Sequence, residues 1–281
     1  MTDEMSKIRL DAYISQKYPS YSRALVQKLI KNGHVKLSGV VKTKTSLLVS
    51  GSEKVDLDVD ILNIMAEKLE LSVIYEDENV VVVDKPLGIL VHSKGAYNPE
   101  ATVASWLKDR SNFDFPADND RAGIVHRLDR ATSGVMICAK NKPTLGFLQK
   151  QFQNHKTKKT YTALVNDVPK QLHAMIDLPI ERNPKKPQTF RVGANGKSAQ
   201  TEYKVLKSDT SKSILELKPV TGRTHQLRVH LSYIGCPIFG DVLYGGKKAD
   251  RLLLHAKSLE ITIPGGERKV FEAKVPPEFD I

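Results

Sequence analysis

Residues 121–134 read RAGIVHRLDRATSG and run directly into an apolar, strand-like segment, Gly134 to Ala139. Asp129 is the only acidic residue at positions 121–166, whereas nine lysines and arginines share that span. Opposite charge nearby favours the ionised form of a carboxyl group, so Asp129 could serve as a nucleophile or base. The alternative is an ordinary salt bridge to a neighbouring arginine, because most such pairs do no chemistry.

The composition narrows the class of partner. The chain has 281 residues and a formal net charge of +11. This excess favours nucleic acid first and an anionic membrane surface second, although it is also typical of a solubilising surface. Cys138 and Cys236 lack the spacing of a metal site or disulfide framework, which predicts a cytoplasmic protein. No secretory signal and no apolar run of about eighteen residues is present, so no membrane segment is expected.

The first sixty residues have the pattern of a small unit. One helix is predicted at residues 8–17. A second helix begins after Ser22, a good N-cap, and ends at Gly33, which suits a left-handed residue. Short strands are predicted at residues 35–41, around a Ser-Gly turn, and at residues 54–57.

The rest of the chain predicts a larger α+β domain. Strands are expected at residues 72–75, 79–83, 134–139, 159–165, 199–206, 213–219 and 259–263, and helices at residues 143–155 and 225–234. Strands and helices do not alternate regularly, so the sheet is expected to be mixed and largely antiparallel with flanking helices. The predicted division is a domain at 1–60, a linker at 61–70 and a second domain at 71–281.

Four ordered segments resemble the RluA/RluD-type pseudouridine synthases. They are VVVDKPLGILVH at 81–92, HRLDRATSG at 126–134, KTYTALV at 159–165, and LEL at 215–217 followed by TGRTHQLRVHL at 221–231. The resemblance covers nearly the whole chain. It implies an enzyme that isomerises uridine to pseudouridine within structured RNA, using neither a metal nor an organic cofactor.

The same resemblance implies roles for individual residues. Asp129 would attack the ribose or assist loss of the uracil, Tyr161 would stack on the base, and Arg223 would pair with Asp129 and orient it. Contacts with the substrate are expected from Arg127, His126, Leu217 and Lys159. Judged by the residues alone, Tyr161 could instead be a half-buried strand aromatic and Arg223 a phosphate clamp.

The N-terminal unit resembles the RNA-binding domain of the ribosomal-protein-S-four type. The resemblance lies in Arg9-Leu10-Asp11, Ser22-Arg23 and residues 29–35. It implies an RNA-binding surface that includes Arg9, Arg23, Lys28 and Lys31.

The expected substrate, by resemblance, is large-subunit ribosomal RNA, with tRNA left open. A non-catalytic ribosome-assembly protein that binds RNA is an alternative from another class. An N-glycoside hydrolase is a third reading, but a hydrolase also wants a second carboxylate to activate water. RNA is the expected partner, a membrane is not, and the chain is expected to be a monomer.

Overall fold

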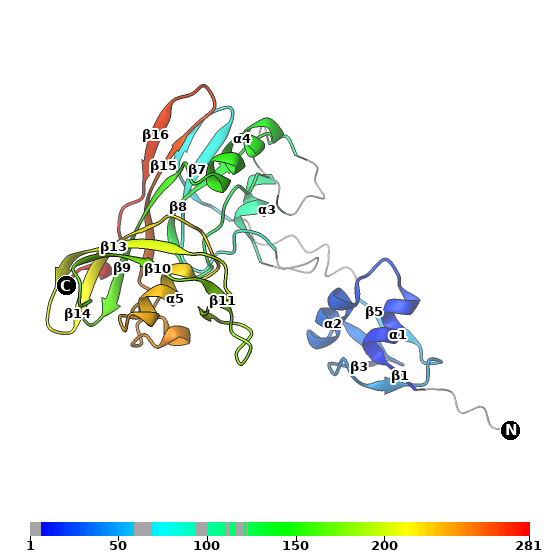
Figure 1. Cartoon of the computed structure of the whole chain (residues 1–281). Helices are drawn as coiled ribbons and strands as arrows, with labels where there is room; N and C mark the ends of the chain where they lie inside the picture. Colours follow the sequence, from blue (N-terminus) through cyan, green and yellow to red (C-terminus); the bar gives the residue numbers. More distant parts are fainter. Residues whose placement is uncertain are drawn as a thin grey trace. The chain divides into compact units, whose positions relative to one another are not determined.

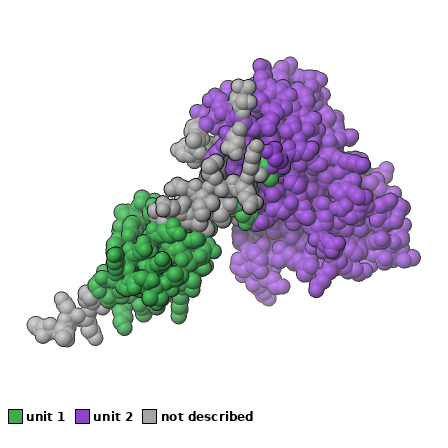
Figure 2. All heavy atoms as spheres, turned by 180° about the vertical axis from the view of Figure 1, so that it is seen from behind, with its two compact units in different colours: residues 1–69, 93–101 green, residues 70–92, 102–281 purple. Residues whose placement is uncertain are grey.

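The computed structural model describes residues 7–58, 69–93, 100–108, 110, 113–115, 121 and 123–281. The chain divides into two compact units, residues 1–69 with 93–101 and residues 70–92 with 102–281 (Figure 2). Positions 61–68 of the predicted linker lie outside the described residues, so the boundaries predicted at 60 and 70 stay a prediction. Within the described ranges, no helix is long and apolar enough to cross a membrane.

The first unit contains two helices and short strands (Figure 1). They are β1 (Ile8–Arg9), α1 (Leu10–Lys17), α2 (Arg23–Lys31), β2 (Val35–Leu37), β3 (Val40–Val41), β4 (Leu48–Val49) and β5 (Val55–Leu57). Ser22 caps α2 as predicted, because its hydroxyl accepts the backbone N–H of Leu25 at 3.3 Å. The first helix begins two residues later than predicted, since Ile8 and Arg9 instead pair with β4.

The core of this unit forms between the two helices and the strands. The apolar face of α2 buries Leu25, Val26, Leu29 and Ile30, and Leu10 of α1 is equally inaccessible. Burial of apolar area on this scale is the main force that holds so small a unit together.

The second unit is built on a nine-stranded sheet. Its strands are β6 (Ser72–Glu76), β7 (Val80–Lys85), β8 (Ser133–Ala139), β9 (Lys158–Asn166), β10 (His173–Asp177), β13 (Gln200–Ser208), β14 (Lys212–Pro219), β15 (Leu254–Thr262) and β16 (Arg268–Glu272). The order is β10-β13-β14-β9-β15-β8-β7-β6, and β16 pairs with β15. Only the β8–β15 pair is parallel among these described strands, which confirms the mixed, largely antiparallel α+β prediction.

Helices and a small hairpin flank this sheet (Figure 1). They are α3 (Val103–Lys108), α4 (Lys142–Gln153), α5 (Gln226–Tyr233), the 3-10 turns η2 (Val242–Tyr244) and η3 (Pro277–Phe279), and the hairpin strands β11 (Ile180–Arg182) and β12 (Phe190–Val192). The helix α4 packs against β8, whereas α5 contacts β12 and η2. Strands β10, β11, β12 and β16 were not predicted. They are three to five residues long, and such short strands give little alternation to detect.

Candidate active site

One cavity of ≈ 570 Å³ in the second unit gathers most of the predicted site residues. Its lining comes from the loop before β8, the end of α4 and the start of β9, and the segment from Pro219 to Arg228. The predicted residues that line it are His126, Arg127, Asp129, Lys159, Tyr161 and Arg223. Leu217 does not line the cavity. It is fully buried in the core and pairs across the sheet with Tyr161.

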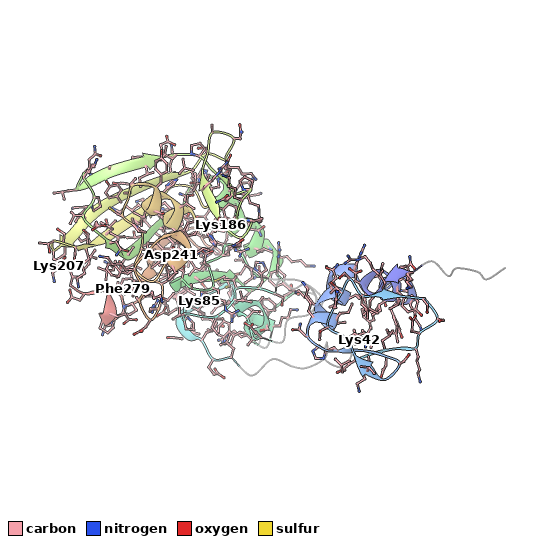
Figure 3. The ribbon with its side chains drawn as sticks, turned by 90° about the horizontal axis from the view of Figure 1, so that it is seen from below. Lys42, Lys85, Lys186, Lys207, Asp241 and Phe279 are labelled. Atoms are coloured by element: carbon pink, nitrogen blue, oxygen red, sulfur yellow. The ribbon has the colours of Figure 1, made fainter. Side chains whose placement is uncertain are left out.

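The loop that carries Asp129 is held by the turn after β7. Lys85 is fully buried within the second unit (Figure 3). Its ammonium group donates to the carbonyls of Pro86 at 2.8 Å and Ile89 at 3.0 Å, which closes that turn. The N–H of Gly88 then donates to the carbonyl of Arg130 at 2.9 Å. The residue after Asp129 is therefore fixed to the turn that follows β7.

The segment HRLDRATSG ends in a glycine, Gly134, for a steric reason. It lies at φ +114°, and a Cβ atom at this position would come within 2.2 Å of the carbonyl oxygen of Ala256. Gly134 pairs with Ala256 where β8 meets β15 in parallel. Only glycine allows the two backbones to approach so closely, and this approach sets where the Asp129 loop leaves the sheet.

Two basic side chains face the Asp129 carboxylate. Nη1 of Arg228 lies 3.6 Å from Oδ2 of Asp129, and Nε2 of His225 lies 3.8 Å from the same oxygen. Arg223 was expected to pair with Asp129, but the structure gives that position to Arg228. Although Arg223 lines the cavity, its Nε donates to the carbonyl of Ser198 at 2.9 Å.

Arg228 is held in place by Asp241, a carboxylate other than Asp129. Its Nε and Nη2 donate to the two carboxylate oxygens of Asp241 at 2.7 and 2.8 Å, and its guanidinium lies 4.9 Å from the ring centre of Tyr244. Asp241 is 2% exposed and lies among the side chains of the second unit (Figure 3). A bidentate pair fixes both the position and the plane of a guanidinium, so Arg228 presents its remaining nitrogen to Asp129.

Tyr161 stands on β9 at the cavity wall. Burial, reinforced by the negative charge of Asp129, raises the pKa of its hydroxyl. The phenol therefore stays protonated near neutral pH. Its ring, supported by Leu217 from the neighbouring strand, offers an apolar face to the cavity.

His126 and Lys159 both have pKa values lowered by burial. The pKa of His126 falls to about 3, with a smaller contribution from the charge of Lys159, so its imidazole is neutral. Its Nε2 accepts the N–H of Ile137 at 3.2 Å, and its ring stacks on Phe152 at 4.6 Å. Burial lowers the pKa of Lys159 to about 8, and its ammonium group reaches the carbonyl of Thr221 at 3.4 Å.

The lining as a whole is cationic. Asp129 is the only carboxylate among the described lining residues, against four lysines and arginines: Arg127, Lys159, Arg223 and Arg228. Arg127 is exposed and forms no hydrogen bond or ion pair with the described residues. In the same residues, no group of three or more His, Cys, Asp or Glu side chains could hold a metal ion. The arrangement suits a polyanionic substrate that presents one reacting carbon to one carboxylate.

The chain was compared with known proteins. The family model described as RNA pseudouridylate synthase matches residues 79–233, more than half of the sequence. The chain belongs to this family. A second model, the S4 domain, matches residues 8–55. RNA is therefore a partner of this pseudouridine synthase.

Individual relatives agree with this family. An uncharacterized RNA pseudouridine synthase from Aquifex aeolicus is 40% identical over 246 residues, 86% of this chain and 78% of the relative. The ribosomal large subunit pseudouridine synthase D of Borreliella burgdorferi is 36% identical, with 100% of this chain and 90% of the relative aligned. The solved structure of human RNA pseudouridylate synthase domain containing 4 is similar at a TM-score of 0.60 and 29% identity. That match covers 74% of this chain and 90% of the human chain.

The S4 domain of this pseudouridine synthase holds two of its predicted RNA-binding residues in fixed positions. Arg9 and Arg23 both donate to the carboxylate of Asp11, which is fully buried and also accepts from Gln27 at 2.6 Å. These hydrogen bonds, that from Arg9 first, hold the pKa of Asp11 far below its ordinary value. Lys31 is exposed on α2, eight residues after Arg23.

Sequence reasoning missed part of the site of this pseudouridine synthase: His225, Arg228, Asp241 and Tyr244. His225 and Arg228 lie in the segment TGRTHQLRVHL at 221–231, at the start of a predicted helix. They are three residues apart, and this spacing would place both on one face of the helix. The N-cap of that helix is His225, and no side-chain pattern in the sequence indicates its φ of +58°. Asp241 and Tyr244 gave no signal in the sequence, because they reach Arg228 only through the fold.

Proposed function

We propose that this enzyme converts specific uridines of large-subunit ribosomal RNA to pseudouridine, with Asp129 as its catalytic carboxylate. The observation that carries the proposal is the lone carboxylate in a cationic cavity, beside a ring that can stack on a base. The choice of ribosomal RNA rests on relatives such as the enzyme of Borreliella burgdorferi. Such an enzyme would act in the cytoplasm, and we propose that it acts as a monomer.

The cavity suits isomerisation better than hydrolysis. Breaking a glycosidic bond creates positive charge on the sugar, which a carboxylate close to the anomeric carbon stabilises. A hydrolase would use a second carboxylate to activate water, but the described lining contains only Asp129. We therefore propose that Asp129 either attacks the anomeric carbon or assists elimination of the uracil, which turns and rejoins through carbon 5.

The other lining residues would position the RNA. The target nucleotide must leave its stack, because its glycosidic bond is otherwise inaccessible. Tyr161 would stack on the extruded uracil, since its protonated phenol is a poor base. The exposed guanidinium of Arg127 would occupy the space that the base leaves. Arg223 and Lys159 would contact phosphates.

Asp129→Asn tests the catalytic role. This substitution preserves shape but removes the ionised carboxylate, so tritium release from RNA labelled at uridine carbon 5 should stop while RNA affinity is kept. Asp250→Asn is a matched control, because Asp250 is exposed and does not line the cavity. Activity within about tenfold of wild type, ~1.4 kcal/mol in barrier height, would contradict the assignment.

Pseudouridine mapping tests the substrate. Ribosomal RNA and tRNA from cells with and without the gene should differ at positions in the large-subunit RNA. A difference confined to tRNA would identify the alternative substrate. No difference, together with defective ribosome assembly, would indicate the non-catalytic RNA-binding protein instead.

A further inference from the structure

A histidine and a tyrosine connect Asp129 to the β11–β12 hairpin. Nδ1 of His225 lies 2.7 Å from the hydroxyl oxygen of Tyr244, and Nε2 of the same ring faces Asp129 at 3.8 Å. The hydroxyl of Tyr244 also accepts the backbone N–H of Phe190, on β12, at 2.9 Å. The ring of Phe190 contacts that of His225 edge-on, with centres 5.7 Å apart. His225 is thus held on both sides.

The proton positions follow from these contacts. The hydroxyl of Tyr244 accepts from Phe190, and Nδ1 of His225 is the acceptor for its one proton among the described residues. If Tyr244 donates to Nδ1, the ring proton of neutral His225 must be on Nε2, where it points at a carboxylate. The opposite assignment would leave the tyrosine proton without an acceptor among the described residues and would turn a lone pair of Nε2 toward Asp129.

Both neighbours of the carboxylate contact the same oxygen. Arg228 and His225 each come nearest to Oδ2 of Asp129, so Oδ1 lies farther from both nitrogens, and neither oxygen accepts a hydrogen bond from a described residue. Oδ1 is consequently the oxygen on the side away from these two nitrogens. The backbone of His225 is strained in this position, because a φ of +58° is unusual for a residue with a side chain.

We propose that Tyr244 fixes His225 as the Nε2–H tautomer, and that His225 then acts as a positioning residue that orients Asp129 with Oδ1 toward the substrate. This inference rests on the proposed catalytic role of Asp129. The groups that face His225 are Asp129, Arg228, Asp241, Arg127 and Tyr244. Burial lowers the pKa of His225 more than the charge of Asp129 raises it, which agrees with a neutral ring.

Tyr244→Phe is the deciding variant. It keeps the ring that lies on Arg228 and removes only the hydroxyl. We expect kcat for tritium release to fall about tenfold or more, which is the smallest loss usual when a partner that fixes a histidine tautomer is removed. KM for RNA should be almost unchanged. Tyr233→Phe is the matched control, since Tyr233 is 62% exposed on α5 and does not line the cavity. A kcat of Tyr244→Phe equal to wild type would overturn the proposal.

The tautomer can be measured directly in the free protein. Nitrogen-15 NMR of histidine-labelled wild type should show His225 protonated on Nε2, and Tyr244→Phe should populate the Nδ1–H form. His225→Gln keeps an amide donor and should retain more activity than His225→Ala. An Nδ1–H or doubly protonated His225 in wild type refutes the proposal, even if Tyr244→Phe fails to fold. Wild-type inactivity on ribosomal RNA would refute the proposed function but leave this measurement valid.

Discussion

Replacing Arg228 by lysine, in parallel with Arg223→Ala, separates the two arginines of the motif. Arg228 alone spans Asp129 and Asp241, because its planar guanidinium makes two hydrogen bonds to Asp241 and still faces Asp129. A lysine ammonium is a point charge and cannot serve both carboxylates in this geometry. We expect Arg228→Lys to lower kcat with little effect on RNA affinity, and Arg223→Ala to do the reverse.

The magnitude follows from the distance between the charges. Two unit charges 3.6 Å apart attract by roughly 4–5 kcal/mol at an effective dielectric constant of about 20. The Asp129 side chain is 23% exposed, so solvent screens part of this attraction. Because the lysine keeps its charge, this attraction is lost only when its ammonium group stays with Asp241 and no longer faces Asp129, which is the outcome we expect. A net loss of about 2–3 kcal/mol then corresponds to a fall in kcat of roughly 30- to 150-fold. Arg223→Ala should instead flatten the salt dependence of RNA binding by about one unit of slope.

The assay is single-turnover tritium release, combined with salt titrations of RNA binding. Arg268→Lys provides a control for the substitution, because Arg268 pairs with Glu260 and does not line the cavity. Arg228→Ala is less suitable, since it would leave the buried Asp241 unpaired, a loss of about 3–5 kcal/mol in stability. Near-normal kcat in Arg228→Lys together with a large loss in Arg223→Ala would refute this reasoning and restore Arg223 as the partner of Asp129.

Three further predictions concern the sheet, the cavity and the two units. Gly134→Ala should sharply reduce thermal stability, because the added methyl group would meet the Ala256 carbonyl; Gly146→Ala, with open space around it, should not. Burial lowers the pKa of Lys159 to about 8, so its positive charge is lost as pH rises through that value. RNA affinity should therefore fall between pH ~7 and ~9 in the wild type but not in Lys159→Met. A chain lacking residues 1–60 should fold by circular dichroism and keep activity on short RNA but bind structured RNA more weakly; insolubility or unchanged affinity would contradict this.

The sequence predicted the sheet better than it predicted the polar site. Val80 to Val83 are all fully buried, so their apolar run was a reliable indication of a strand covered on both faces. The hairpin strands β11 and β12 were missed, because three residues on each side of a turn show no period. Yet Phe190 on that hairpin contacts the ring of His225, so a segment without a sequence signal contributes to the site.

The choice between Arg223 and Arg228 could not be made from the sequence. Both residues lie in the same motif and both line the cavity. What separates them is Asp241, thirteen residues beyond Arg228, and the left-handed residue His225, which turns the chain into α5 between the two arginines. The family resemblance implies that one arginine of this motif pairs with Asp129. Only the folded structure shows that this arginine is Arg228.

In the proposed mechanism, the pair of hydrogen bonds from Arg228 to Asp241 also explains how Asp129 is both oriented and reactive. At 3.6 Å, the contact between Arg228 and Asp129 is too long for a hydrogen bond, whereas both bonds to Asp241 are short. A guanidinium free to move would be expected to close on Asp129 and occupy both of its oxygens. Because Asp241 holds it back, Arg228 contributes its charge while Oδ1 of Asp129 stays open. A buried second carboxylate that never touches the substrate would therefore keep the first one available for chemistry.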